Sequence, residues 1–297
     1  MSFKLAACAV ALACLVLSVE GVSLVRNRRV VGGYQYARGE YPFHVSLWYM
    51  GDDIETYNEE TPDLYHMLGG VLVEDQWVLT NAAFFDSEDG ILSEADDFSK
   101  WRVVLGMYGQ KDAEDEAMFR EIDSIYFPPE FDYDTTYGDI ALIKLTEPAD
   151  LSSPRVNTGT YQTTSDCPSE GQTCRIIGWG ARSEEHSDTS EFPVETEVNV
   201  KSVEDCQEAY EPVMAEMGLL NIDDTMICAG RFRGGHDACD GDFGSPLLCR
   251  CINDGRLRDV VVGLASTGYG CGRPEYPGIY TRVSSHASWI EETIADN

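Results

Sequence analysis

Residues 237–246 read Asp-Ala-Cys-Asp-Gly-Asp-Phe-Gly-Ser-Pro. The glycines, aspartates and proline in this stretch are turn-forming residues. On both sides of it, the chain alternates short runs of β-branched and aromatic residues with turns of similar composition, a pattern typical of short strands. The runs cover residues 43–49, 70–79, 101–105, 140–145, 173–178, 260–265 and 278–283. The sequence therefore predicts an all-β fold.

Helical signals are few. Residues 202–210 form one candidate, with Ser202 placed to cap its N-terminus. A second begins at Ser285 and puts Trp289, Ile290 and Ile294 on one side of a helix. A length of 297 residues, of which 43% are hydrophobic, suits one core-forming unit. We expect one all-β domain with a short intermediate helix and a C-terminal helix.

The first 29 residues carry processing signals. Residues 1–21 contain Lys4 and then an apolar run over residues 5–19, the form of a secretory signal peptide; a buried first helix is the alternative. The run is too short to span a bilayer, and no later segment is apolar enough to anchor the chain. Residues 22–29 form a short basic propeptide that ends Arg26-Asn27-Arg28-Arg29, a form that subtilisin-like secretory convertases recognise. The sequence predicts a secreted, extracellular protein with one domain over residues 30–297.

Charge and cysteine content limit the function further. The chain has 52 acidic and 21 basic residues, a net charge of −31, which repels nucleic acid and anionic membranes and favours cationic partners or metal ions. Ten cysteines are present, and removal of Cys8 and Cys14 with the signal peptide leaves eight, without zinc-binding spacing. In an oxidising compartment this even number predicts disulfides rather than a metal site.

Five short blocks resemble the chymotrypsin/trypsin-like (S1) serine protease family. They occur in the family's order and at roughly its spacing, which is far more specific than any single motif. The blocks are Val30-Val31-Gly32-Gly33, Trp77-Val78-Leu79-Thr80, Asp139-Ile140-Ala141-Leu142, Gly178-Trp179-Gly180 and Asp237-Ala238-Cys239. The resemblance covers residues 30–297. It implies two six-stranded antiparallel β-barrels packed face to face, with the substrate cleft between them.

Two of the three catalytic positions depart from the family's pattern. The family's nucleophilic serine stands in Gly-Asp-Ser-Gly-Gly-Pro, and residues 241–246 place Phe243 there, a side chain without a nucleophilic atom. The block that supplies the histidine base places Ala83 at its position. Only Asp139 of the triad is retained. We therefore expect an inactive homologue that is not an enzyme.

A rebuilt catalytic site is the alternative. Ser245 lies two residues after the nucleophile position, which leaves open an endopeptidase of trypsin-like specificity with Ser245 as its nucleophile. Such a displacement disturbs the distances from the nucleophile to its base and to the oxyanion donors, which argues against this site. The histidines are interpreted as core or surface residues, and His66 resembles a structural histidine of the family. The other four are His44, His186, His236 and His286.

The family's disulfides are retained in part. The resemblance implies the pairs Cys174–Cys249, Cys206–Cys228 and Cys239–Cys271, and elimination leaves Cys167–Cys251. The family's bridge at the histidine loop is replaced at both ends, by Leu68 and Phe84. We expect these two side chains, with Phe243, to fill the space once held by the disulfide and the catalytic groups.

The resemblance also assigns an activation site and a specificity pocket. Asp242 matches the aspartate that forms a buried ion pair with the amine released by cleavage between Arg29 and Val30. We expect this cut to order the surrounding loops, and the alternative is that both features are inherited relics. Asp237 matches the trypsin-like carboxylate for a lysine or arginine side chain. The other pocket positions are Gly268, Gly278 and Ser266, which also matches the serine that bonds the catalytic aspartate. Thr267 departs from the family's usual tryptophan on the cleft wall.

Acidic residues cluster in loops that, by family position, rim the cleft. One cluster, with Asp112, Glu114 and Glu116, falls where some trypsins bind calcium. Met107 stands at a ligand position, so we expect a solvated loop and no cofactor, with calcium as the alternative.

Three functions remain open. The first is a non-catalytic protein that binds a basic protein partner, such as a protease or a zymogen, through the acidic rim loops. It would act as a cofactor, a decoy, or an immune or adhesion factor, as inactive relatives in the family do. The second is the Ser245 endopeptidase, and the third is an acidic, calcium-associated matrix protein. We expect the first, and the sequence sets no oligomeric state.

Overall fold

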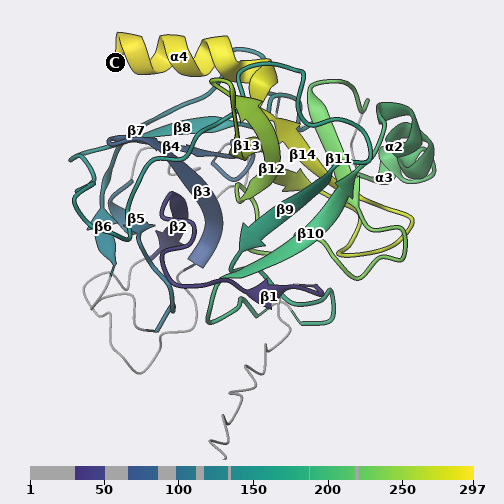
Figure 1. Cartoon of the computed structure of the whole chain (residues 1–297), viewed down its shortest axis with the longest axis horizontal. Coiled ribbons are helices and arrows are strands. Elements are labelled where there is room, and N and C mark those ends of the chain that lie inside the picture. The colour runs from purple at the N-terminus through teal and green to yellow at the C-terminus, as the bar shows by residue number, and fades with distance from the viewer. Residues whose placement is uncertain are drawn as a thin grey trace, which may run out of the picture.

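Two antiparallel β-sheets form the body of the protein (Figure 1). The structure is a computed structural model that describes residues 31–50, 66–85, 98–111, 117–132, 135–186, 188–217 and 221–297. Each sheet curls into a barrel-like unit, and strands far outnumber helices. The all-β prediction is therefore confirmed.

The first sheet has the strand order β6-β5-β2-β3-β4-β8-β7. Contacts between β5 and β7 bring its two ends together. Its strands are β2 (His44–Tyr49), β3 (His66–Glu74), β4 (Trp77–Thr80), β5 (Trp101–Leu105), β6 (Met118–Arg120), β7 (Ile122–Tyr126) and β8 (Ala141–Leu145). The run predicted over residues 70–79 is two strands, since the chain turns at Asp75 and Gln76.

The second sheet has the strand order β1-β10-β11-β14-β13-β12-β9, and β9 also pairs with β10, which closes the barrel. Its strands are β1 (Tyr34–Gln35), β9 (Thr173–Gly178), β10 (Val194–Val200), β11 (Met226–Gly230), β12 (Pro246–Asn253), β13 (Arg256–Thr267) and β14 (Gly278–Arg282). Each sheet has seven strands, one more than the six expected. The additions are the short β1 and β6, which pair at one end of each strand order.

Helices occupy the periphery. The N-terminus of α2 (Val203–Tyr210) is capped by the Ser202 side chain, which accepts a hydrogen bond from the Asp205 backbone N–H at 3.0 Å. The other helices are α3 (Met214–Met217), α4 (Ala287–Asp296) and 3-10 turns at Phe98–Lys100 and Val283–His286. Within the described ranges, none of them has the length and apolar character needed to cross a bilayer.

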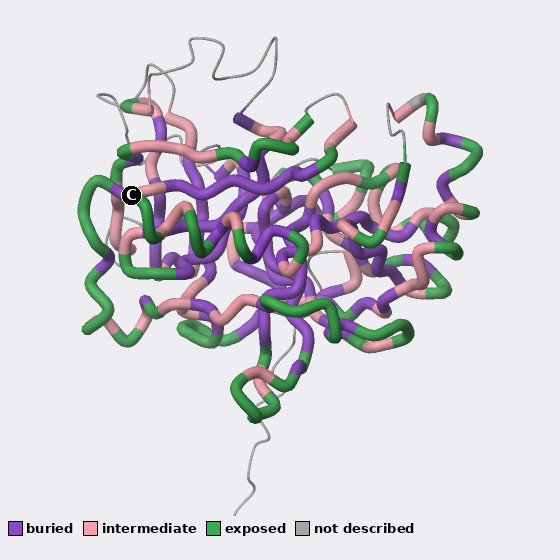
Figure 2. The backbone as a smooth tube through the Cα atoms, turned by 90° about the horizontal axis from the view of Figure 1, so that it is seen from above, coloured by how far each residue is buried: buried purple, intermediate pink, exposed green. Residues whose placement is uncertain are grey.

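Five apolar clusters form the core of the described residues, and one of them is a junction cluster that contains residues of both barrels. The junction cluster joins Leu79 and Leu142 of the first barrel to Leu248 and Leu264 of the second, and Ile290 of α4 packs into it. Figure 2 shows the buried backbone running through the middle of the molecule, with exposed segments around it. The two barrels are thus fixed against each other along an apolar face, which sets the positions of the loops at that junction.

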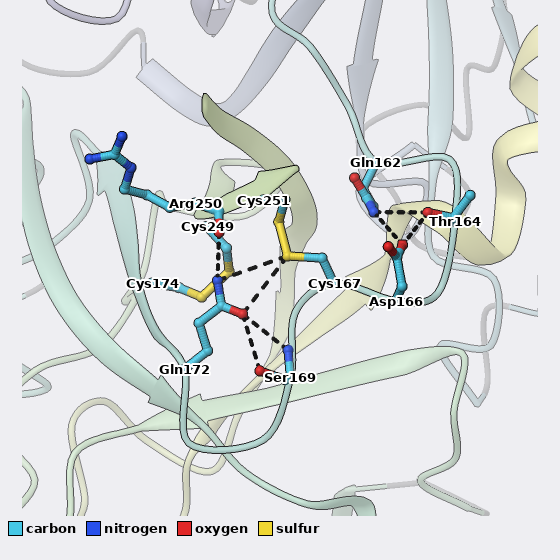
Figure 3. Close-up of a disulfide and its surroundings, with 10 residues drawn as sticks. All are labelled: Gln162, Thr164, Asp166, Cys167, Ser169, Gln172, Cys174, Cys249, Arg250 and Cys251. Atoms are coloured by element: carbon cyan, nitrogen blue, oxygen red, sulfur yellow. Dashed lines mark hydrogen bonds between the residues drawn. A yellow bond between two sulfur atoms is a disulfide. The ribbon is translucent and has the colours of Figure 1, made fainter. Parts of the chain in front are cut away.

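Four disulfides cross-link the second half of the chain. They have the pairing expected from the sequence: Cys167–Cys251, Cys174–Cys249, Cys206–Cys228 and Cys239–Cys271. Figure 3 shows that Cys249 and Cys251 of β12 receive two of these bridges. The loop that carries Cys167 is braced by the Gln172 amide, which donates to the Arg250 carbonyl at 3.0 Å.

Candidate functional site

Asp139 precedes β8 and is fully buried at the junction of the two barrels. Its Oδ1 accepts hydrogen bonds from the backbone N–H groups of Ala82 and Ala83, both at 2.7 Å, and its Oδ2 accepts one from Ser266 Oγ at 2.5 Å. Burial raises the pKa of Asp139, and these hydrogen bonds oppose that rise. The structure thus brings the retained aspartate, the base position Ala83 and Ser266 together.

Phe243 lies where β12 is about to begin, and its backbone carbonyl accepts a hydrogen bond from the Gly69 N–H at 2.7 Å. The half-buried ring packs against the core cluster of the first barrel, which contains the buried Leu68. Phe84 packs against the same cluster and makes an edge-on contact with Trp101, with ring centroids 6.0 Å apart. The three side chains expected to replace the lost disulfide and catalytic groups therefore share one apolar cluster.

Ser245 is buried, with no exposed surface. Its Oγ faces Gly69, where a Cβ would overlap the hydroxyl, and it has no hydrogen-bond partner among the described residues. A hydroxyl enclosed in this way is shielded from a substrate carbonyl, and no base among the described residues lies within hydrogen-bond reach of it.

The five histidines each have a contact away from Asp139. His66 Nδ1 lies 2.6 Å from Ser46 Oγ, and its Nε2 lies 2.9 Å from the Gly241 carbonyl. Burial lowers the pKa of His66 to about 4, so its ring is neutral at physiological pH. The nearest partners of the others are Tyr36 and Trp179 for His44, Ser183 for His186, Thr196 for His236 and Glu130 for His286.

Asp242 is fully buried beside the Gly178–Gly180 segment. Its carboxylate accepts hydrogen bonds from the Gly180 N–H at 2.7 Å and from the Cys239 N–H at 3.0 Å. A Cβ at Gly178 or Gly180 would overlap this carboxylate, which explains why glycine occupies both positions. Burial raises the pKa of Asp242 to about 7, and nearby Asp240 adds to the rise.

The start of the described chain lies against this region. Val31 forms an isolated antiparallel bridge with Asp237, and Gly32 leaves no room for a Cβ against Gly235 and His236. Arg29 and Val30, the residues of the expected cleavage site, lie outside the described residues. The bridge of Val31 nevertheless shows that the segment following that site lies against Asp237, five positions before Asp242 in the sequence.

Asp237 faces a pocket whose other lining residues include Phe243, Ser266, Gly268 and Gly278. The residue is 3% exposed, and its carboxylate accepts hydrogen bonds from the Gly272 and Ala238 N–H groups, both at 2.9 Å. Burial raises the pKa of Asp237 to about 7. A buried carboxylate at a pocket of this kind is a ready partner for a guanidinium or an amidinium.

Two glycines shape the pocket differently. A Cβ on Gly278 would lie 2.5 Å from Asp237 Oδ1, so a larger residue at this position would collide with the pocket carboxylate. A Cβ on Gly268 would lie 3.5 Å from the nearest atom and would meet no close neighbour. The space beside Gly268 is therefore part of the open pocket. The sequence placed these two glycines, Thr267 and Ser266 at the pocket, and all four line it.

An ion pair that the sequence did not predict stabilises the wall of the pocket at Cys271. Arg273 Nε lies 2.7 Å from Glu184 Oε1, and the same oxygen accepts a hydrogen bond from the Cys271 N–H at 2.5 Å. Hydrogen bonding to Arg273 lowers the pKa of Glu184. The two residues are 89 positions apart, and nothing in the local pattern of either segment links them.

The candidate calcium ligands Asp112, Glu114 and Glu116 lie outside the described residues, as do the acidic clusters within residues 51–65 and 86–97. Across the part of the chain that the structure describes, His, Cys, Asp and Glu side chains form no group of three that could hold a metal ion.

Comparisons with known proteins agree with this geometry. The Trypsin family matches residues 30–290. Transmembrane protease serine 9 of Rattus norvegicus is 33% identical over 271 residues, which cover 90% of this chain and 22% of that protein. Serine protease 1 of Rattus norvegicus is 30% identical over 289 residues, covering 96% of this chain and 99% of that protein. Trypsin of Sus scrofa is 31% identical over 269 residues, covering 91% of this chain and 97% of that protein. The chain belongs to the trypsin-like S1 family of serine proteases.

Proposed function

We propose that this member of the trypsin-like family is a secreted, non-catalytic homologue that acts by binding a basic protein partner. The observation that carries the proposal is the pair of side chains at the catalytic positions. Phe243 offers no atom that could attack a carbonyl, and Ala83 offers none that could accept a proton. Without both groups, covalent acyl transfer by the usual route of the family has no chemical basis.

The surroundings of the triad position support the same conclusion. Asp139 already accepts hydrogen bonds from Ala82, Ala83 and Ser266. Its carboxylate is therefore solvated by the protein without a histidine and has a structural role. The enclosed hydroxyl of Ser245 supports a loss of catalysis rather than its transfer to a neighbouring serine.

Partner binding is favoured by what the chain retains. The net charge of −31 speeds the encounter with a basic protein through long-range attraction. The pocket around Asp237 is present and offers a carboxylate to a lysine or arginine side chain of that partner. Phe243 forms part of the wall of this pocket, so binding there leads to no cleavage.

Secretion and proteolytic activation are part of the proposal. The apolar run of residues 5–19 and the basic segment ending at Arg29 support export and a subsequent cut before Val30. The released amine would pair with Asp242, whose carboxylate has a raised pKa of about 7 while only N–H groups bond it.

The experiment is a turnover assay on the cut protein with a peptidyl-arginine amide, alongside trypsin of Sus scrofa as the active control. We expect no product above the blank reaction while the control is fully active. A second arm immobilises the cut protein, captures partners from the native secretion and measures the mass of what is bound. A captured basic protein of unchanged mass supports the proposal, and turnover or a cleaved partner contradicts it.

A further inference from the structure

A shallow groove lies on the second barrel between α2, the segment 273–277 and the turn that follows β11. Its apolar lining includes Phe232, Pro274 and Pro277. Phe232 is 88% exposed, more than any other large hydrophobic side chain in the described parts of the chain. An aromatic ring presented almost entirely to water beside a groove is the kind of feature that marks an interaction surface.

The turn that carries Phe232 is braced. Arg231 Nε donates to the Glu197 carbonyl of β10 at 2.8 Å, and its Nη2 lies 3.0 Å from Glu197 Oε2. The Gly234 N–H donates to the Arg231 carbonyl at 2.9 Å, which closes the turn. Phe232 is therefore held on an ordered turn, so a partner that covers it would lose little backbone entropy in ordering it.

The other side of the groove is equally well fixed. Tyr210 of α2 donates its hydroxyl to the Pro277 carbonyl at 2.6 Å. Pro277 also packs on Gly230, where a Cβ would lie 3.0 Å from the proline ring. Pro277 directly precedes Gly278 of the Asp237 pocket, so one segment separates the groove from that pocket.

The charged lining of the groove is mainly acidic. Asp205, Glu208 and Glu275 line it, and Lys201 is the one cation among the lining residues. All three acidic residues are exposed, and none of their carboxylates forms an ion pair within the described ranges. Their charges are thus available to a cationic partner.

We propose that this groove docks an extended segment of the protein partner, in which lysine or arginine side chains alternate with apolar ones. The inference rests on the proposed function and adds to it a binding surface outside the Asp237 pocket. The cationic side chains pair with Glu208 and Glu275, and an apolar side chain packs on Phe232 and the two prolines. An anionic membrane does not fit, since both the lining and the chain as a whole are negatively charged.

The test uses a fluorescein-labelled octapeptide of alternating lysine and leucine, with its binding measured by fluorescence anisotropy at physiological salt. The double variant E208Q/E275Q is compared with E291Q/E292Q on α4, which removes the same charge from exposed positions elsewhere. We expect about five-fold weaker binding for the groove variant and less than about two-fold for the α4 variant. Equal losses in the two variants overturn the inference, because they mean that only overall charge matters.

The apolar contact at Phe232 is tested with a second pair of variants. F232S is compared with I252S, since Ile252 is also highly exposed, at 68%, but lies on the β12–β13 hairpin. We expect about ten-fold weaker peptide binding for F232S and no change for I252S. Unchanged binding to F232S overturns the inference, whereas cleavage of the bound peptide, seen by mass spectrometry, contradicts the proposed function instead.

Discussion

The backbone N–H of Ala83 lies 2.7 Å from Oδ1 of Asp139. This contact shows that the loop which would carry the catalytic base still has its place beside the aspartate. The departures from the family's pattern at these two catalytic positions thus lie in the side chains, while the backbone beside Asp139 keeps its hydrogen bond. The consequence can be tested by putting the side chains back.

The double variant A83H/F243S restores a base and a nucleophile at the two changed positions. Because Asp139 and Ser266 are already in place, we expect it to hydrolyse a peptidyl-arginine amide at least about a hundred-fold faster than either single variant. The measurement is steady-state turnover of the cut proteins. A folded double variant with no more turnover than A83H alone would show that the backbone around the site has also changed.

The Asp237 pocket makes a prediction about ligand binding and pH. Burial raises the pKa of Asp237 to about 7, and the ionised carboxylate is the form that binds benzamidine. The affinity of the pocket for benzamidine should therefore increase about ten-fold with each pH unit as the pH is raised to 7, and it should level off at higher pH. F243S should bind more tightly than the natural chain, because Phe243 lines the pocket. D237N should not bind at all. A titration that is flat between pH 5 and 8, or no gain in F243S, speaks against the pocket as described.

The contribution of Asp242 to stability should depend on pH before cleavage and not after it. In the uncut chain its pKa is about 7, against an ordinary value of 3.8, so the folded state binds the extra proton between these pH values. The free energy of unfolding therefore falls as pH rises through this window, by about 2–3 kcal/mol between pH 5 and 8. D242N should lack this dependence. Urea denaturation of D242N and of the natural chain at each pH therefore separates the contribution of Asp242 from that of the buried histidines.

After cleavage before Val30, this dependence should disappear. An ammonium paired with Asp242 favours the ionised carboxylate, which is then charged in both the folded and the unfolded chain between pH 5 and 7, so D242N should cost similar stability at both pH values, on the order of 3–5 kcal/mol. If cut and uncut proteins give the same pH profile, the cleavage site is a relic without structural effect.

Leu68 tests whether packing has replaced the lost disulfide. It is fully buried in the first barrel's cluster, so L68A should destabilise the fold by about 2–5 kcal/mol. L151A is the matched control, since Leu151 is 42% exposed and should lose less than about 0.5 kcal/mol. Chemical denaturation of both variants decides this, and similar losses would show that Leu68 fills no critical space.

Much of the fold could be predicted from the sequence because short β-branched runs and turn residues alternate clearly. Residues 101–105 and 173–178 are strands with the expected bounds. The strand Val194–Val200 went unpredicted, because only alternate residues are buried and the positions between them carry the polar residues Glu195, Glu197 and Asn199.

The site was predictable where blocks of sequence carry it, and not where distant loops meet. Asp139, Ser266, Asp237 and Asp242 lie as expected because each is set by its own strand end or turn. The Glu184–Arg273 ion pair and the groove at Phe232 depend on which loops the fold places side by side, and one sequence contains no signal for that. The isolated aromatic residue in the polar segment Arg231-Phe232-Arg233 does not by itself locate the groove.

The proposed function requires that the chain has lost acyl transfer altogether. The most direct measurement is intact-mass spectrometry of the cut protein after prolonged exposure to a fluorophosphonate, with A83H/F243S as the control that should react. We expect an unchanged mass for the natural chain. A stoichiometric adduct that peptide mapping places on Ser245 would contradict it.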